Sequence, residues 1–95
     1  MAKFEIVYSS SFKKDLKKYI HDAESFDLIR DCIRLLEEGG CDNIPLRMKP
    51  HQLFGNYKNY RECHIKSDLL LIWHQDDKCK TVALARVGSH ANLFD

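Results

Sequence analysis

The chain has 95 residues, of which 44% are hydrophobic and 31% are charged, and its formal net charge is +1. This length fits one small domain with a modest core, which argues against a large internal cofactor cavity. A net charge this close to zero also argues against the strongly basic composition that is typical of nucleic-acid-binding domains.

The N-terminal half predicts one strand followed by two helices. Residues 3–8 alternate polar and apolar side chains, which is typical of a strand. Three serines follow as candidate N-caps, and apolar residues then recur at helical spacing as far as Ile20. The pattern breaks at residues 22–25, and a second apolar stripe begins at Phe26. A pair of glycines at 39–40 predicts the end of that helix.

The C-terminal half predicts three strands that form an antiparallel meander. Residues 60–65, 69–73 and 80–87 have strand-like sequences and are separated by short turns. The preceding residues 41–59 contain two prolines and a glycine, and irregular segments of this length are often functional. After the last strand, Ser89 is placed to cap one short helical turn.

These elements predict an α+β fold with the order β-α-α-β-β-β, as a single domain over residues 1–95. The two N-terminal helices are expected to cover one face of a small antiparallel sheet. The first strand must join an edge of this sheet or insert beside a neighbour. The other face of the sheet is expected to receive a ligand.

The charges are unevenly distributed along the chain. Residues 22–42 contain seven acids and only two arginines, whereas residues 45–66 contain five basic residues and only one acid, Glu62. This asymmetry predicts a positive patch on a neutral molecule, which would suit a polyanion. The alternative is an ordinary solvated surface.

Candidate chemical groups collect in the basic half of the chain. His51, His64 and His90 lie there, Asp68 follows His64 across a tight turn, and Phe94 lies one helical turn after His90. Imidazoles can remove a proton from a ribose 2′-hydroxyl and protonate the departing 5′-oxygen, because their pKa lies near neutrality. Guanidinium groups stabilise a phosphorane, and an aromatic ring stacks on an unpaired base. The set therefore suits phosphodiester cleavage without a metal.

A zinc site is the competing interpretation of the same atoms. Cys63 and His64 are adjacent on a predicted strand and therefore point to opposite faces, which disfavours a shared tetrahedral ion. The four cysteines show no Cys-x-x-Cys spacing. The chain has no apolar leader, and its longest apolar run is too short to cross a membrane. We therefore expect a cytoplasmic protein with reduced thiols, no metal, no cofactor and no membrane contact.

The segments HQLFGNYKNYRECHIKSDLLLIW and ARVGSHANLF resemble the YafQ-like branch of the RelE/ParE superfamily of type II toxins. The shared pattern is H-x-L-x-G, R-x-x-H-I, D-x-L-L-I and R-x-G-[ST]-H-x-x-L-F, and it covers roughly the second half of the chain. The resemblance implies a ribosome-dependent endoribonuclease that cleaves messenger RNA in the A site and leaves a 2′,3′-cyclic phosphate. It also implies a cognate antitoxin, with operator DNA bound through the antitoxin complex.

The resemblance implies a role for each matching residue. The catalytic positions are His51, His64, Asp68, His90 and Phe94, and the basic positions near the phosphate are Arg61 and Arg86. His64 and His90 are candidates for acid and base, with Asp68 orienting or sharing a proton. Lys49 and Lys58, from the basic segment, are expected to bind RNA phosphates.

Two other functions fit the same fold. A ParE-like inhibitor of DNA gyrase would not need the histidines and the aspartate, and a non-catalytic antitoxin-binding module would bind its antitoxin without arresting growth. Two departures from the family pattern also bear on function. The chain is nearly neutral whereas many such toxins are strongly basic, and Ser67 stands where a proline often precedes the aspartate.

Overall fold

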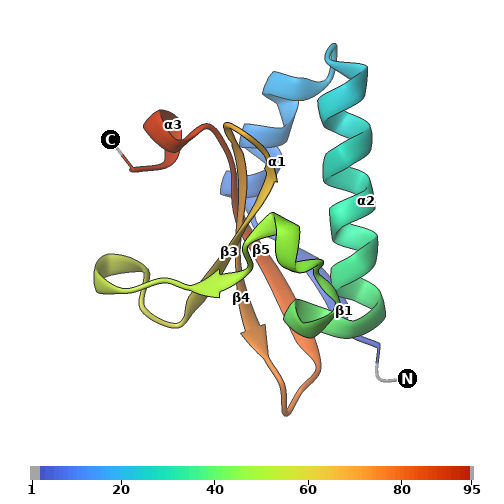
Figure 1. The fold of residues 1–95 in the computed structure, drawn as a ribbon, viewed down its shortest axis with the longest axis vertical. Coiled ribbons are helices and arrows are strands. Elements are labelled where there is room, and N and C mark those ends of the chain that lie inside the picture. Colours follow the sequence, from blue (N-terminus) through green and yellow to red (C-terminus); the bar gives the residue numbers. More distant parts are fainter. Residues whose placement is uncertain (1–2, 95) are drawn as a thin grey trace.

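The computed structural model describes residues 3–94, which form a five-stranded sheet with two helices packed against one face (Figure 1). The strand order is β1-β5-β4-β3-β2. The regular elements are β1 Glu5–Tyr8, α1 Ser10–Leu16, α2 Ala23–Gly39, β2 His51–Gln52, β3 Tyr60–Lys66, β4 Leu69–Asp76, β5 Thr81–Gly88 and α3 His90–Phe94. Short 3₁₀ turns occupy Lys17–Tyr19, Gly40–Asn43, Leu46–Met48 and Gly55–Tyr57.

The first helix begins at the predicted serine cap but ends earlier than predicted. The Ser9 hydroxyl accepts a hydrogen bond from the Phe12 N–H at 3.0 Å and donates one to the Ala85 carbonyl at 3.1 Å. Such a cap stabilises a helix by about 1 kcal/mol. Helix α1 ends at Leu16, and the next residues, Lys17–Tyr19, form a 3₁₀ turn instead of continuing the helix.

The second helix is fixed at both ends by local chemistry. At its start, Asp22 accepts hydrogen bonds from the backbone N–H and the hydroxyl of Ser25, which lower the pKa of its carboxyl group. At its end, Gly40 has a φ of 68°, and a Cβ there would approach the Phe4 ring to 2.8 Å. Glycine therefore provides both the left-handed turn and the space for the ring.

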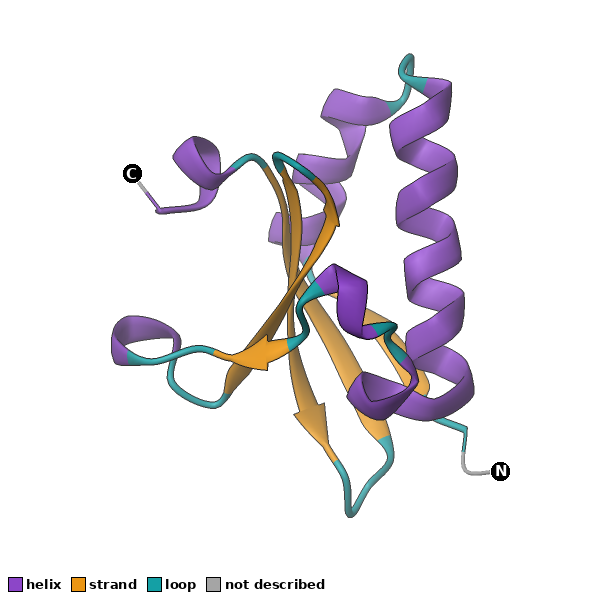
Figure 2. Ribbon diagram, in the orientation of Figure 1, coloured by secondary structure: helices purple, strands orange, loops and turns teal. Residues whose placement is uncertain are grey.

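The sheet is mixed, not wholly antiparallel as the sequence predicted. The meander of β3, β4 and β5 is confirmed, but β1 pairs in parallel with the outer edge of β5. The two helices form the connection that a parallel pair requires. A fifth strand, β2, extends the other edge by pairing with β3 inside the segment expected to be irregular. Figure 2 shows that the rest of this segment is short helical turns and loops.

Apolar side chains fill both faces of the sheet. The larger cluster lies under α1 and α2 and includes Phe12, Leu36 and Trp73, each 0% exposed. A smaller cluster on the opposite face contains Leu70 and Ile72, covered by Leu93 of α3. The face predicted to be free for a ligand is thus partly covered by α3 and by the segment around Gly55–Tyr57, both left of the sheet in Figure 1.

Within residues 3–94, no helix is long and apolar enough to cross a membrane.

Candidate active site

Two histidines meet over a buried carboxylate at the β2–β3 edge. His51 pairs with Glu62 in the sheet register, and its Nε2 lies 3.2 Å from Glu62 Oε1. The Nε2 atom of His64 lies 3.7 Å from the same oxygen. The Glu62 side chain is 7% exposed, whereas the His51 and His64 side chains are 46% and 37% exposed. The two imidazoles therefore remain accessible while one buried group fixes their positions.

The second ring nitrogen of His51 is also engaged. Its Nδ1 lies 2.7 Å from the carbonyl oxygen of Lys49, which can only accept a hydrogen bond. Both nitrogens of His51 therefore face acceptor oxygens.

The terminal helix carries the third histidine and is attached at both ends. The Asp68 carboxylate accepts a hydrogen bond from the His90 backbone N–H at 3.1 Å, and Ser89 caps the same turn through the Asn92 N–H. At the other end, Leu93 is buried against the sheet. The rings of His90 and Phe94 lie 4.9 Å apart between centroids. These contacts hold an exposed imidazole and a ring together on the second face of the sheet.

Tyr57 connects the terminal helix to the loop before β3. Its hydroxyl donates to the Leu93 carbonyl at 3.3 Å. Its ring packs edge-on against Phe94 at 5.5 Å and against Tyr60 at 6.0 Å. The long segment before β3 is thus ordered against α3 by an aromatic cluster.

The guanidinium group of Arg86 lies on the same face of the sheet as the carboxylate of Glu62. The register places Glu62, Ile72 and Arg86 in one row across β3, β4 and β5. Arg86 donates from Nε and Nη2 to the buried carboxylate of Asp15, at 2.6 and 3.1 Å. This hydrogen-bonded pairing raises the pKa of the arginine. A fixed cation is thereby available two strands from the histidines.

Basic residues border His64. A recess of about 510 Å³ is lined by Arg47, Lys49 and Lys66 together with His64. Lys66 also contacts the exposed Glu24 at 3.3 Å. The rim of this recess is therefore positively charged, although the net charge of the whole chain is only +1.

Comparison with known proteins identifies the family of the chain. The family described as bacterial toxin of type II toxin-antitoxin system, YafQ, matches residues 4–95. This chain belongs to the YafQ family. The mRNA interferase toxin YafQ of Escherichia coli is 31% identical over 94 residues, which are 99% of each chain.

Solved structures agree with this assignment to the YafQ family. The crystal structure of E. coli YafQ has a TM-score of 0.86 at 29% identity, over 98% of this chain and 100% of that one. The E. coli DinJ-YafQ toxin-antitoxin complex has a TM-score of 0.81 at 30% identity, over 99% and 100% of the chains. A metal-bound toxin from Helicobacter pylori has a TM-score of 0.78 at 35% identity, over 96% and 99%.

The structure of this YafQ-family chain brings most of the predicted site residues to one face of the sheet. His51 and His64 share Glu62, while Asp68, His90 and Phe94 meet at α3. Within residues 3–94, the Asp68 side chain forms no hydrogen bond or ion pair with His64. It holds the backbone of α3 instead.

The predicted basic residues are more widely separated. Arg61 pairs with Trp73 in the register and lies on the helix-covered face, so the structure does not bring it to the histidines. Lys49 is exposed and borders the recess beside His64, with a left-handed φ of 53°. Lys58 is exposed on the loop that precedes β3.

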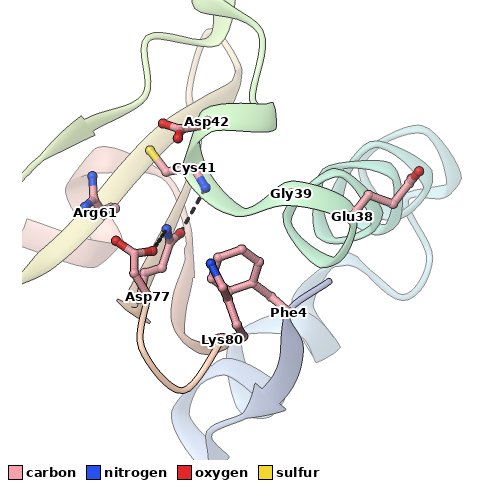
Figure 3. Close-up of a pocket in the computed structure, with 9 residues that line it drawn as sticks. Phe4, Glu38, Gly39, Cys41, Asp42, Arg61, Asp77 and Lys80 are labelled. Carbon is pink, nitrogen blue, oxygen red and sulfur yellow. Dashed lines mark hydrogen bonds between the residues drawn. The ribbon is translucent and has the colours of Figure 1, made fainter. Parts of the chain in front are cut away.

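Arg61 lines a separate pocket of about 350 Å³ (Figure 3). In that view Arg61, Asp77 and Cys41 lie on one side of the pocket, and Lys80 lies against the Phe4 ring. The pocket contains no candidate histidine, and its charged lining is mixed in sign. It is therefore not the candidate active site.

Sequence reasoning missed three residues that organise this site. Glu62 alternates with Tyr60 and His64 on its strand, which was a usable signal for a shared face, but its pairing with His51 depends on the unpredicted β2. Tyr57 sits in a segment with no periodicity. Asp15 was one polar residue on a lysine-rich helix, and nothing local indicates its partner 71 residues away.

No group of three His, Cys, Asp or Glu side chains that could hold a metal ion occurs in the part of the chain that the structure describes. Cys63 points into the core beneath the helices, with its sulfur 3.5 Å from that of Cys32, while His64 points to the opposite face. The hydrogen bond with the Cys32 thiol and the burial of the site raise the pKa of Cys63, which keeps it protonated. These thiols form part of the core.

Proposed function

We propose that this YafQ-family toxin is an mRNA interferase, an endoribonuclease that cleaves messenger RNA on the ribosome by acid–base catalysis. The observation that carries the proposal is the presentation of His64, His90 and Arg86 on one face of the sheet by three different elements. The name of the E. coli relative, mRNA interferase toxin YafQ, supports the same activity. The positive rim around His64 supports binding of a polyanion.

In the proposed reaction, one imidazole removes the proton of the ribose 2′-hydroxyl. The 2′-oxygen then attacks the adjacent phosphorus, and the bond from phosphorus to the 5′-oxygen breaks. A second imidazole, protonated beforehand, gives its proton to the departing 5′-oxygen. The products are a 2′,3′-cyclic phosphate and a 5′-hydroxyl, and no metal takes part in the step.

We assign the acid and base work to His64 and His90, because both imidazoles are exposed on the reacting face. Arg86 stabilises the charge that develops on the phosphorane oxygens. Phe94 stacks on a base beside His90. His51, whose nitrogens are both engaged, orients the cluster through Glu62 and draws phosphate toward it.

Asp68 receives a different role from the one that the resemblance implied. Its carboxylate binds the backbone N–H of His90, so it places the histidine at the site. We propose this positioning role in place of direct proton transfer.

The antitoxin and the ribosome complete the proposal. The complex of E. coli YafQ with DinJ supports a cognate antitoxin for this chain as well. We propose that the antitoxin neutralises the toxin and that their complex binds operator DNA. The near-neutral charge implies that docking on the ribosome uses local patches such as the rim around His64.

Cleavage mapping tests the proposed function directly. A defined messenger RNA is exposed to purified protein with and without translating ribosomes, and 5′ ends are mapped by primer extension. We expect cuts within codons that appear only with ribosomes, and an inactive His90→Ala variant. Intact RNA in both arms with folded protein, together with DNA damage after induction, would instead indicate gyrase poisoning.

A further inference from the structure

Asp15 is a buried carboxylate that the proposed chemistry does not use. It lies on α1 and is 4% exposed. Its oxygens accept three hydrogen bonds, from Arg86 Nε at 2.6 Å, from Arg86 Nη2 at 3.1 Å and from the Val87 N–H at 3.1 Å. A buried charge with three donors is a costly arrangement to build for packing alone.

The edge of β5 explains why the carboxylate lies there. Strand β1 pairs with β5 only as far as Leu84, so the next residues of β5 have no strand beside them on that side. Helix α1 replaces the missing strand, because Ser9 donates to the Ala85 carbonyl and Asp15 accepts from the Val87 N–H. Asp15 therefore stands at the edge of the sheet.

A bulge in β5 turns the Arg86 side chain toward the β5 edge at which Asp15 lies, although Arg86 belongs to the face of the sheet opposite the helices. The register pairs Ile72 with Arg86 but Trp73 with Leu84, which leaves Ala85 as an extra residue. Such bulges re-aim side chains and are common near functional sites. Arg86 consequently shares the face of Ile72 while its guanidinium reaches around to Asp15.

Arg86 also lines a recess that adjoins the proposed catalytic centre. The recess measures about 330 Å³ and is lined by Ser9, Ser11, Asn56, Tyr57, Tyr60, Ala85 and Arg86. The Asp15 side chain is only 6% exposed and the Arg86 side chain 30%, so the recess meets the cation and not the carboxylate behind it. Two of the five guanidinium N–H donors bind Asp15, and the Tyr57 hydroxyl also neighbours the guanidinium, so only part of the donor set remains for a ligand.

The other groups in the recess match the remaining parts of a nucleotide. The Tyr57 and Tyr60 rings stand at 88° to each other, so a base can stack on one ring and meet the edge of the second. The exposed amide of Asn56 offers both a donor and an acceptor to the edge of a base. Tyr57 also touches Phe94, which makes the recess continuous with the terminal helix.

We propose that this recess is a nucleotide-binding subsite for single-stranded RNA, beside the cleavage centre. Arg86 binds the phosphate that the recess shares with the cleavage centre, Tyr57 and Tyr60 hold the base of the neighbouring nucleotide, and Asn56 contacts its edge. Asp15 is the positioning residue that fixes the guanidinium. The inference rests on the proposed endoribonuclease function, and it adds a second point at which the RNA is held.

The test is a titration of isotopically labelled protein with a 2′-O-methyl RNA trinucleotide, which cannot be cleaved, followed through the backbone amides by NMR. We expect the largest shifts at Asn56, Tyr57 and Arg86. Shifts confined to the amides of His64 and His90, or no shifts at millimolar trinucleotide, would overturn the subsite.

Variants separate the role of each group. Arg86→Gln should weaken trinucleotide binding about tenfold or more, as expected for loss of a hydrogen bond to a charged group. Asp15→Asn keeps the shape and should weaken binding to a similar extent, and the double variant should add little to either. Arg30→Gln, on the helix-covered side, is the matched control and should bind normally. If the losses of binding free energy in the two single variants added in the double variant, Asp15 would not act by positioning Arg86.

Asn56→Ala tests the subsite without disturbing the fold, because the Asn56 side chain is exposed. It should weaken binding while the melting temperature stays unchanged. Unchanged binding by Asn56→Ala and Arg86→Gln would contradict the subsite. Cleavage mapping on ribosomes is a separate readout. Binding of the trinucleotide in the recess without cleavage of messenger RNA would contradict the proposed function but not the subsite.

Discussion

At the scale of single residues, Glu62 has the largest influence on the geometry of the site. Its buried carboxylate lies beside both His51 and His64, because the β2–β3 register places His51 opposite Glu62 and His64 follows on the same strand. A carboxylate in this position orients imidazoles without touching substrate itself. Its effect on catalysis should therefore appear through the histidines.

The variant Glu62→Gln should lower the cleavage rate about 10- to 100-fold, since small displacements of catalytic groups are costly. The amide keeps the volume but removes the negative charge that lies beside both rings. Single-turnover cleavage on programmed ribosomes measures the effect. Asp27→Asn, an exposed acid on α2, is the control and should retain the full rate; equal losses in both variants would contradict the positioning role.

Replacement of His90 tests the acid–base assignment more directly. His90→Ala should lower the cleavage rate about 10²- to 10⁴-fold, the usual contribution of a general acid or base. The residue is exposed, so stability should change by about 0.5 kcal/mol or less. His21→Ala, an exposed histidine near the start of α2, serves as the control. Full toxicity of His90→Ala would exclude His90 from the chemistry.

At the scale of elements, the five-residue helix α3 is too short to be stable alone and depends on its attachments. Asp68 binds its first N–H, Leu93 is buried beneath it, and the Tyr57 hydroxyl binds its last turn. Each attachment comes from a different part of the chain. The position of His90 and Phe94 therefore depends on the whole face of the sheet.

Removal of the Asp68 attachment should loosen α3 without unfolding the domain. In Asp68→Ala, amide hydrogen exchange should accelerate in residues 90–94 and stay unchanged in β4 and β5. Asp76→Ala, at the opposite turn of β4, is the matched control for loss of a turn aspartate. Unchanged exchange in α3 would show that Asp68 acts on the site by another route.

The cap of α2 predicts a pH dependence of stability. Hydrogen bonds from Ser25 lower the pKa of Asp22, so its ionised form stabilises the folded state above the unfolded pKa. That contribution is lost as the pH falls through the lower, folded pKa. Thermal melts should show a lower melting temperature for Asp22→Ala than for wild type at pH 7, and this gap should shrink as the pH falls below the ordinary pKa of an aspartate. A gap independent of pH would contradict the charged cap, and Asp31→Ala, in the middle of α2, is the control.

At the scale of the whole molecule, the two faces of the sheet have different tasks. The face under α1 and α2 contains the larger core, including Trp73 and Phe12. The other face carries a smaller apolar cluster ringed by the histidines, Arg86 and α3. Because the larger core lies on the other face, charged and mobile side chains at the site do not interrupt the packing that maintains the fold.

Sequence patterns predicted the regular parts of this molecule well. Alternation, helical spacing and the continuous apolar run of β4 placed three meander strands and two helices. The parallel pairing of β1 and the two-residue β2 were missed, since partners distant in sequence decide them. Asp15 and Tyr57 were missed for the same reason. Arg61 was assigned to the phosphate by resemblance, yet its own alternation with Glu62 places it on the other face.

We propose that the protein cleaves RNA through the ribose 2′-hydroxyl without a metal. The most direct measurement uses ribosomes programmed with two messenger RNAs that differ by one 2′-deoxy substitution at the cleaved nucleotide. A separate control exposes RNA without ribosomes to the protein in the presence of a metal chelator. We predict that the unmodified RNA yields a 2′,3′-cyclic phosphate and a 5′-hydroxyl, and that the 2′-deoxy RNA stays intact. Cleavage of the 2′-deoxy RNA, or products with a 5′-phosphate, would contradict the account.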